Sequence, residues 1–144
     1  MQPIPHLSVP VRDLDEALDF YVHALGCRAA RARAGFIDVW FYGMQVTLQD
    51  RPDEVAQTPV GGSRHFGVTL GRAEFDAVVR RLTAGGADWV SPPHTDDQGL
   101  DTEQTKAKIA DPSGNVIEFK TYRDVGAALE IAGQPDPEPA ARLQ

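Results

Sequence analysis

The chain has 144 residues, which corresponds to about one domain. Its hydrophobic fraction of 42% and charged fraction of 24% are ordinary for a globular protein and exclude a disordered chain or a disulfide scaffold. The net charge of −7 argues against a nucleic-acid partner, because a phosphate backbone would be repelled by the chain as a whole.

The sequence predicts a cytoplasmic protein with no membrane partner. The single Cys27 cannot form an internal disulfide, and the N-terminal residues lack the pattern of a secretory signal. The longest uncharged apolar-rich stretch, Val39–Gln49, is far too short to cross a bilayer.

The first half of the chain predicts one strand, one helix and three further strands. Pro5–Val11 is a strand in which His6 precedes alternating apolar residues. A helix begins at Asp13, with Glu16 completing a pattern typical of a helix N-terminus, and ends before Gly26. The three strands that follow are predicted over residues 27–33, 36–42 and 44–49.

The second half repeats this order, so each half predicts a βαβββ module. Arg64–Leu70 is again a strand that opens with a histidine, His65. A helical stripe over Phe75–Leu82 ends at Gly85. Strands follow over residues 87–91, 106–110 and 115–122, and the proline-containing stretch 91–103 is predicted to be an irregular loop.

These patterns define the expected domain organisation, which is a single domain over residues 1–124. It comprises module one (3–50), a linker rich in proline and glycine (51–63) and module two (64–124), followed by a C-terminal helix (125–133) and a disordered tail (134–144).

The final strand contains the most informative residue, Glu118. It follows the turn Asp111–Asn115, in which proline and glycine set the backbone conformation. Alternation places Glu118 and Lys120 on one face of the strand. A carboxylate on so apolar a strand is costly to bury unless a cation or strong hydrogen bonds compensate it.

Two βαβββ modules that each open with a histidine, followed by the segment DPSGNVIEFK at residues 111–120, resemble the vicinal oxygen chelate superfamily of glyoxalase I, bleomycin-resistance and extradiol-dioxygenase proteins. The resemblance covers roughly residues 3–124. It implies an α+β fold in which the two modules form an open, cavity-containing mixed β-sheet. It also implies a divalent metal ion between the modules, with His6, His65 and Glu118 as ligands. Two imidazoles and one carboxylate suit iron, manganese, zinc, nickel or cobalt and leave positions open for a substrate with two vicinal oxygens.

The last strand of module one departs from the pattern of glyoxalase I, which has a glutamate there. Gln45, Thr47 and Gln49 share one face of this strand. Gln49 is either a fourth metal ligand or a hydrogen-bonding residue beside the metal, and Gln45, Thr47 and Trp40 are candidate substrate-binding residues. A neutral amide is a poor general base, which argues against glyoxalase I isomerisation and leaves the catalytic base unidentified.

The resemblance favours a metal-dependent enzyme, a lyase, isomerase or dioxygenase, that acts on a small substrate chelating the metal. The alternative is a binding protein of the bleomycin-resistance type, which sequesters a drug or metabolite without chemistry. Relatives commonly form homodimers, and two modules can pair within one chain or across a dimer. Arg51, Arg64 and Lys120 are too scattered in the sequence to predict a basic pocket. His23 and His94 are expected to be solvated, and Cys27 to be buried and inert.

Overall fold

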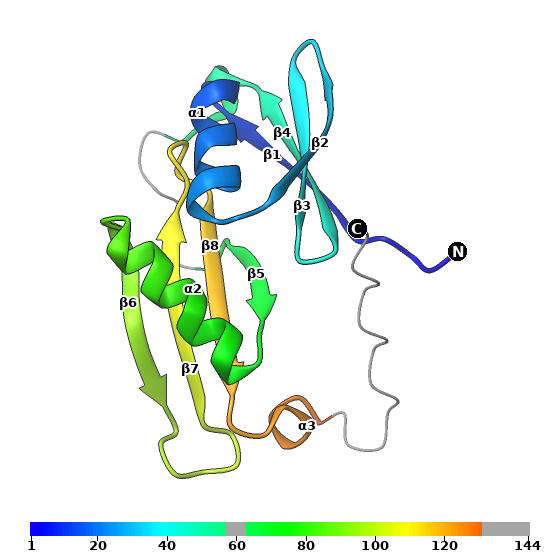
Figure 1. Cartoon of the computed structure of the whole chain (residues 1–144). Helices are drawn as coiled ribbons and strands as arrows, with labels where there is room; N and C mark the ends of the chain where they lie inside the picture. The colour runs from blue at the N-terminus through cyan, green and yellow to red at the C-terminus, as the bar shows by residue number, and fades with distance from the viewer. Residues whose placement is uncertain (57–62, 131–144) are drawn as a thin grey trace.

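The computed structural model of the protein describes residues 1–56 and 63–130, and it contains both predicted modules (Figure 1). The first comprises β1 (His6–Val11), α1 (Leu14–Asp19), the π-helical turn η1 (Phe20–Ala24), β2 (Arg28–Arg33), β3 (Phe36–Phe41) and β4 (Met44–Asp50), followed by the short 3₁₀ turn η2 (Pro52–Glu54). The second comprises β5 (Phe66–Thr69), α2 (Arg72–Ala84), β6 (Trp89–Asp96), β7 (Gln104–Ala110) and β8 (Val116–Tyr122), followed by α3 (Val125–Ala128).

Each module forms a four-stranded mixed sheet, and the predicted α+β fold is confirmed. The strand orders are β1-β4-β3-β2 and β5-β8-β7-β6. β1 pairs with β4 and β5 pairs with β8 in parallel, while the other pairs are antiparallel. Among the described strands, β1 and β5 lie at sheet edges, so each keeps one side of its backbone unpaired by the sheet.

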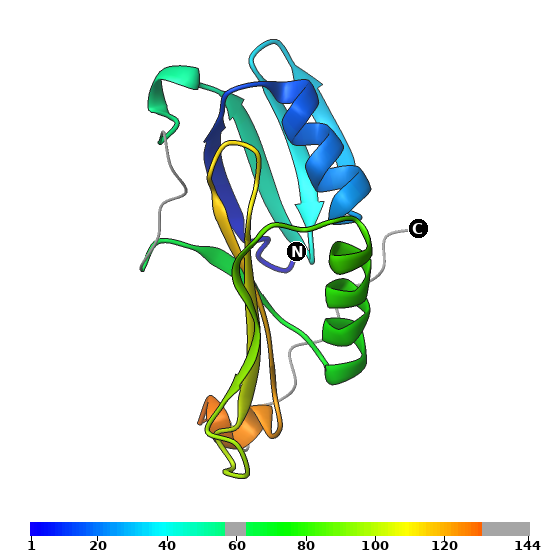
Figure 2. The same cartoon turned by 90° about the vertical axis from the view of Figure 1, so that its left-hand side faces the viewer.

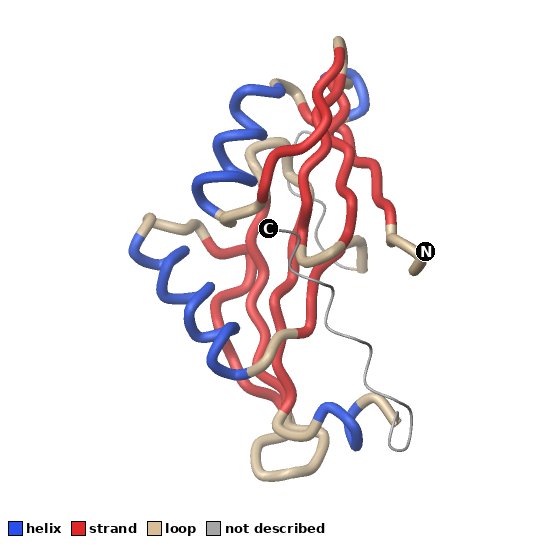
Figure 3. Tube along the Cα trace, turned by 45° about the vertical axis from the view of Figure 1, so that its right-hand side comes forward, coloured by secondary structure: helices blue, strands red, loops and turns tan. Residues whose placement is uncertain are grey.

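The helices cover one face of both sheets, and this arrangement separates the core from a polar surface. Figure 3 shows α1 and α2 on the same side of the strands. Alternate residues of β1, β3, β4, β7 and β8 face these helices and, together with residues of the helices, form the core, which includes Val11, Tyr21, Phe41, Leu48, Phe75, Ile117 and Phe119. The opposite face of each sheet is called the uncovered face below, and on β8 it carries Glu118 and Lys120.

The turn between β7 and β8 joins the two modules. Figure 2 shows this turn, in yellow, beside β1 in dark blue. The buried Tyr21 hydroxyl donates to Asp111 Oδ2 at 2.9 Å, and Asn115 Nδ2 donates to the Pro10 carbonyl at 2.9 Å. The DPSGN segment is therefore a joint between modules as well as a local turn.

The first part of one predicted loop, residues 91–96, is a strand instead. β6 continues through Pro92 and Pro93 to Asp96, although residues 91–103 were expected to be irregular. Proline is tolerated because β6 is an edge strand and its pairing with β7 shifts register before and after Ser91.

Parts of the predicted domain organisation lie outside the described residues, namely residues 57–62 of the linker, residues 131–133 of the predicted C-terminal helix and the whole tail. Of the predicted helix over residues 125–133, Val125–Ala128 form α3, whereas residues 129–130 form a turn. No helix among residues 1–56 and 63–130 is long and apolar enough to cross a membrane.

Candidate functional site

Two of the three predicted metal ligands lie together on the uncovered face of the second sheet. In the parallel pairing of β5 with β8, Gly67 lies opposite Glu118, and His65 precedes Gly67 by two residues on the same face. The distance from His65 Nε2 to Glu118 Oε2 is 3.7 Å. The Glu118 side chain is only 9% exposed and that of His65 is 30% exposed, so the pair is sheltered but reachable.

Gly67 permits the close approach of β5 to β8 beside this pair. A Cβ atom at Gly67 would overlap the backbone carbonyl of Glu118. Because the obstruction is backbone, a side chain at this position can fit only if the two strands move apart.

We therefore expect Gly67→Ala to destabilise the protein by about 2 kcal/mol or more, as overpacking against a backbone atom does. Urea denaturation of wild type and variant at one protein concentration measures this difference. Gly35→Ala serves as the comparison for a glycine-to-alanine change without a clash. Gly35 is a turn glycine with positive φ, and a Cβ atom there would meet no atom within 4 Å. Equal free energies of unfolding for wild type and Gly67→Ala would contradict the expected clash.

Lysine side chains surround the carboxylate of Glu118. Lys108 Nζ lies 3.4 Å from Glu118 Oε2, and Lys120 Nζ lies 3.9 Å from Oε1. Lys106 Nζ contacts Asp96 Oδ2 at 2.7 Å, which raises the pKa of the lysine. The sequence did not predict a basic pocket, because Arg51, Arg64 and Lys120 are scattered along it and Lys106 and Lys108 were not considered. The period-two spacing of Lys106 and Lys108 on a predicted strand was the available signal.

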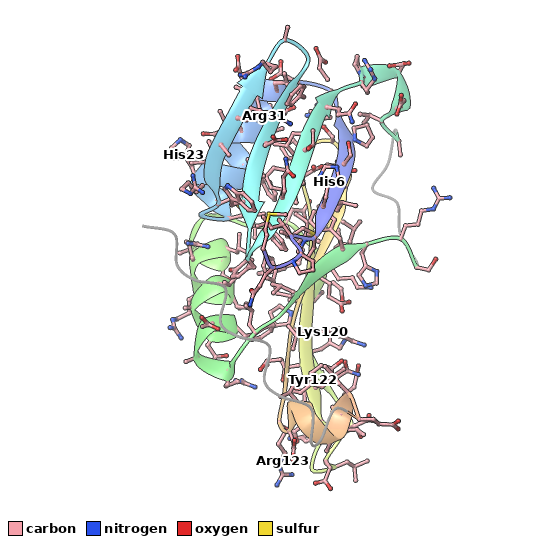
Figure 4. The ribbon with its side chains drawn as sticks, turned by 90° about the vertical axis from the view of Figure 1, so that its right-hand side faces the viewer. His6, His23, Arg31, Lys120, Tyr122 and Arg123 are labelled. Atoms are coloured by element: carbon pink, nitrogen blue, oxygen red, sulfur yellow. The ribbon has the colours of Figure 1, made fainter. Side chains whose placement is uncertain are left out.

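His6 lies on the uncovered face of the first sheet, apart from the pair on the second. It is exposed at the start of β1, opposite Gln45 of β4. In Figure 4, His6 lies over the first sheet, whereas Lys120 lies over the second. Within residues 1–56 and 63–130, no three His, Cys, Asp or Glu side chains lie close enough to hold a metal ion together.

The polar residues of β4 contact a buried carboxylate that sequence reasoning missed. Asp38 on β3 is 2% exposed and accepts hydrogen bonds from Thr47 Oγ1 at 2.7 Å and Gln45 Nε2 at 3.0 Å. Arg31 Nε also donates to it, at 3.0 Å. The candidate substrate-binding side chains Gln45 and Thr47 are thus held in place by Asp38. Its position on the Thr47 face of β3 could be read from the sequence, but its burial could not.

The other two candidates on this sheet also have partners. Gln49 Nε2 donates to Ser8 Oγ on the neighbouring β1. Trp40 is half-buried, with the Arg28 guanidinium 6.0 Å from the centre of its ring. Both residues lie on the uncovered face, as the alternation of the strands predicts.

Stability at acid pH is expected to depend on Asp38. Burial opposes its ionisation, but hydrogen bonds from Thr47, Gln45 and Arg31 prevail and hold the pKa of Asp38 below its ordinary value. A carboxyl whose pKa is lowered by folding stabilises the protein above about pH 4 and loses this contribution as the pH falls below that value. The free energy of unfolding should therefore fall more steeply between pH 5 and pH 3, roughly, for wild type than for Asp38→Asn. Parallel curves for the two proteins would contradict this role.

Two hollows adjoin His65. One, of about 420 Å³, lies between the modules, and its lining includes His65, Pro10 and Asn115. The other, of about 210 Å³, follows β5 on the second sheet and is lined by His65, Glu118 and Lys120 among others. A small ligand therefore has space beside the His65–Glu118 pair.

The remaining candidates of the sequence lie where they were expected. Cys27 is buried, and this burial raises its pKa to about 12, so the thiol stays protonated and inert. His23 and His94 are both exposed.

Comparisons with known proteins agree with this architecture. The family model described as Glyoxalase/Bleomycin resistance protein/Dioxygenase superfamily matches residues 3–119. A glyoxalase/bleomycin resistance protein/dioxygenase from Alicyclobacillus acidocaldarius is 35% identical, with a TM-score of 0.79 over 85% of this chain and 92% of that one. A genomically encoded fosfomycin resistance protein from Listeria monocytogenes is 14% identical, with a TM-score of 0.67 over 84% and 93% of the two chains, and shares the fold alone.

Proposed function

Because the chain belongs to the glyoxalase/bleomycin resistance protein/dioxygenase superfamily, we propose that it is a metal-dependent enzyme acting on a small substrate with two vicinal oxygens. The observation that carries the proposal is the sheltered pair of His65 and Glu118. The reaction would be a lyase, isomerase or dioxygenase reaction of the kinds found in this superfamily.

The donor atoms of this pair fit a divalent transition metal. Two ligands that bind one such ion at about 2.0 to 2.2 Å lie roughly 3 to 4 Å apart. The 3.7 Å between His65 Nε2 and Glu118 Oε2 falls in this range. Iron, manganese, zinc, nickel and cobalt all accept this donor set. When bound, such an ion supplies Lewis acidity toward the substrate oxygens.

The third ligand, His6, would come from a second copy of the chain. In one chain the described residues offer no third His, Cys, Asp or Glu beside His65 and Glu118. His6 opens β1 and His65 immediately precedes β5, and both are edge strands. An edge strand tends to pair or be protected, and in a symmetric dimer β1 of each chain can meet β5 of the other. This arrangement would place His6 beside the partner's His65–Glu118 pair, twice per homodimer.

The residues of the chain would mainly bind and orient the substrate. The amides of Gln45 and Gln49 cannot act as bases near neutral pH. Asp38 is committed to three donors that hold its pKa low, which makes it a weak base. Gln49 would border the metal site from the first sheet of the partner.

A binding protein without chemistry is the alternative, and one observation favours it. Glu118 already contacts the ammonium groups of Lys108 and Lys120, so its charge is compensated in the protein without a metal ion. In this case the same cavity would sequester a drug or metabolite.

Metal content separates the two functions. Elemental mass spectrometry on untagged protein, purified without chelators, should find about one transition-metal ion per chain if the site is complete. Such a result would justify activity screens with thiol adducts of α-ketoaldehydes, with catechols and with epoxides. No metal in the wild type, even after reconstitution with each of the five metals, would reject the enzyme and favour the binding protein.

A further inference from the structure

All the lysines of this chain lie in one place. The sequence contains three lysines, Lys106, Lys108 and Lys120, whereas its arginines are spread over the whole chain. The three lysines lie on β7 and β8, on the uncovered face of the second sheet, around Glu118. A protein with a net charge of −7 thus concentrates positive charge beside its proposed metal ligand.

The strand register makes this cluster costly for the fold. Lys106 lies directly opposite Lys120, and Lys108 directly opposite Glu118. Like charges opposite each other on neighbouring strands repel, and such pairs destabilise a sheet. Because Lys106 is paired with Asp96 and the other two lysines share Glu118, three positive charges face two negative ones.

Metal binding would leave the lysines with even less compensation. A Glu118 carboxylate that ligates a divalent ion offsets only one of its two positive charges and contributes less to Lys108 and Lys120. The ion also adds positive charge within a few ångströms of both ammonium groups. A site of this kind is stabilised when an anion enters it.

We propose that Lys106, Lys108 and Lys120 form a binding site for an anionic group, a phosphate or a carboxylate, on the substrate that the metal chelates. The proposal rests on the proposed function in naming a substrate, but the lysines should bind an oxyanion without the metal.

The surroundings of the lysines suit this role. Their side chains are 24–33% exposed, which leaves the ammonium groups accessible while the stems pack on the sheet. Lys120 Nζ lies 5.6 Å from the ring centre of Tyr122, within the distance of a cation–π contact. Lys120 and Glu118 also line the hollow along β5, so an anion bound there would lie next to the metal ligands.

Titration of inorganic phosphate into metal-free protein at low ionic strength, followed by calorimetry, tests the proposal. We expect saturable binding that weakens at least about tenfold in Lys108→Gln and Lys120→Gln, because each variant loses a charge-assisted hydrogen bond. Arg80→Gln removes the same charge from the exposed surface of α2 and should change the affinity less than about twofold. Acetate, titrated in parallel, separates a general carboxylate site from one selective for phosphate.

Glu118→Gln should change the phosphate affinity in the opposite direction, which makes it the sharper test. It frees Lys108 and Lys120 from their carboxylate, so phosphate should bind several-fold more tightly than to wild type. Glu74→Gln, on α2, is the matched control and should have no such effect.

The outcomes separate this proposal from the metal site. One possible outcome is that wild type binds metal but the lysine variants bind phosphate as tightly as Arg80→Gln does. This outcome would overturn the lysine site and leave the proposed enzyme intact. Lysine-dependent phosphate binding in a wild type that takes up no metal would support the anion site and reject metal dependence. The absence of saturable phosphate binding to wild type would also overturn the proposed lysine site.

Discussion

Glu118→Ala and His65→Ala should each lose the bound metal ion, from about one ion per chain in wild type to less than about a tenth of that. Each substitution removes one of three expected protein ligands, and no other His, Cys, Asp or Glu among the described residues stands ready to replace it. Elemental mass spectrometry after gel filtration measures the content. The affinity of each variant for the metal ion should fall by orders of magnitude, because an ion held by two protein ligands exchanges readily with the buffer.

The controls for this result separate ligation from folding. His23→Ala removes an exposed imidazole on η1, away from the uncovered faces that carry the three expected ligands, and should retain the metal content of wild type. Circular dichroism and thermal denaturation show whether each variant is folded. A folded Glu118→Ala protein that retains one ion per chain would place the metal elsewhere and reject the proposed centre.

Mixing two variants that each fail to bind metal should restore metal binding if the site is shared between chains. His6→Ala and His65→Ala homodimers would each lack a ligand at both sites. In a mixed dimer, one site combines both substitutions, and the other combines intact His6 of one chain with intact His65 and Glu118 of its partner. Random exchange of subunits makes about half of the dimers mixed, so about one site in four should bind metal.

The result depends on exchange of subunits between the dimers. Refolding the two variants together from urea ensures this exchange. Each variant refolded alone is the control and should stay free of metal. A double variant, His6→Ala with His65→Ala, mixed with either single variant should give no recovery, since every site then lacks a ligand. Failure of the two single variants to complement, with wild type loaded and dimeric, would show that His6 is not shared in this way.

The sequence determined the elements of this fold because their causes are local. Apolar residues with a period of 3.6 predicted α2, and alternation predicted β1, β4 and β8. The repeat of a histidine-led strand and a helix predicted two equivalent modules, and the turn Asp111–Asn115 followed from proline and glycine alone. The alternation of side chains along β8 also placed Glu118 and Lys120 on one face.

The sequence was less informative where pairing partners decide the outcome. Residues 91–96 contain two prolines and were expected to form a loop, yet β6 accommodates them because it is an edge strand. Asp38 could be placed on a face but not predicted as buried. Its burial depends on donors from β2 and β4 that gather around it only in the folded sheet.

The candidate site shows the same division. The sequence by itself named His65 and Glu118, through the histidine-led repeat and the family resemblance. Only the tertiary structure brought their donor atoms to 3.7 Å, placed Lys108 and Lys120 against the carboxylate, and put Lys106 opposite Lys120. It also left His6 on the other module, so that within the described residues of one chain no third ligand joins His65 and Glu118, and in the proposed centre His6 of a second chain would supply it. The physical reason is that periodicity fixes which face a side chain occupies, whereas its neighbours across strands depend on sheet order and register, which long-range contacts decide.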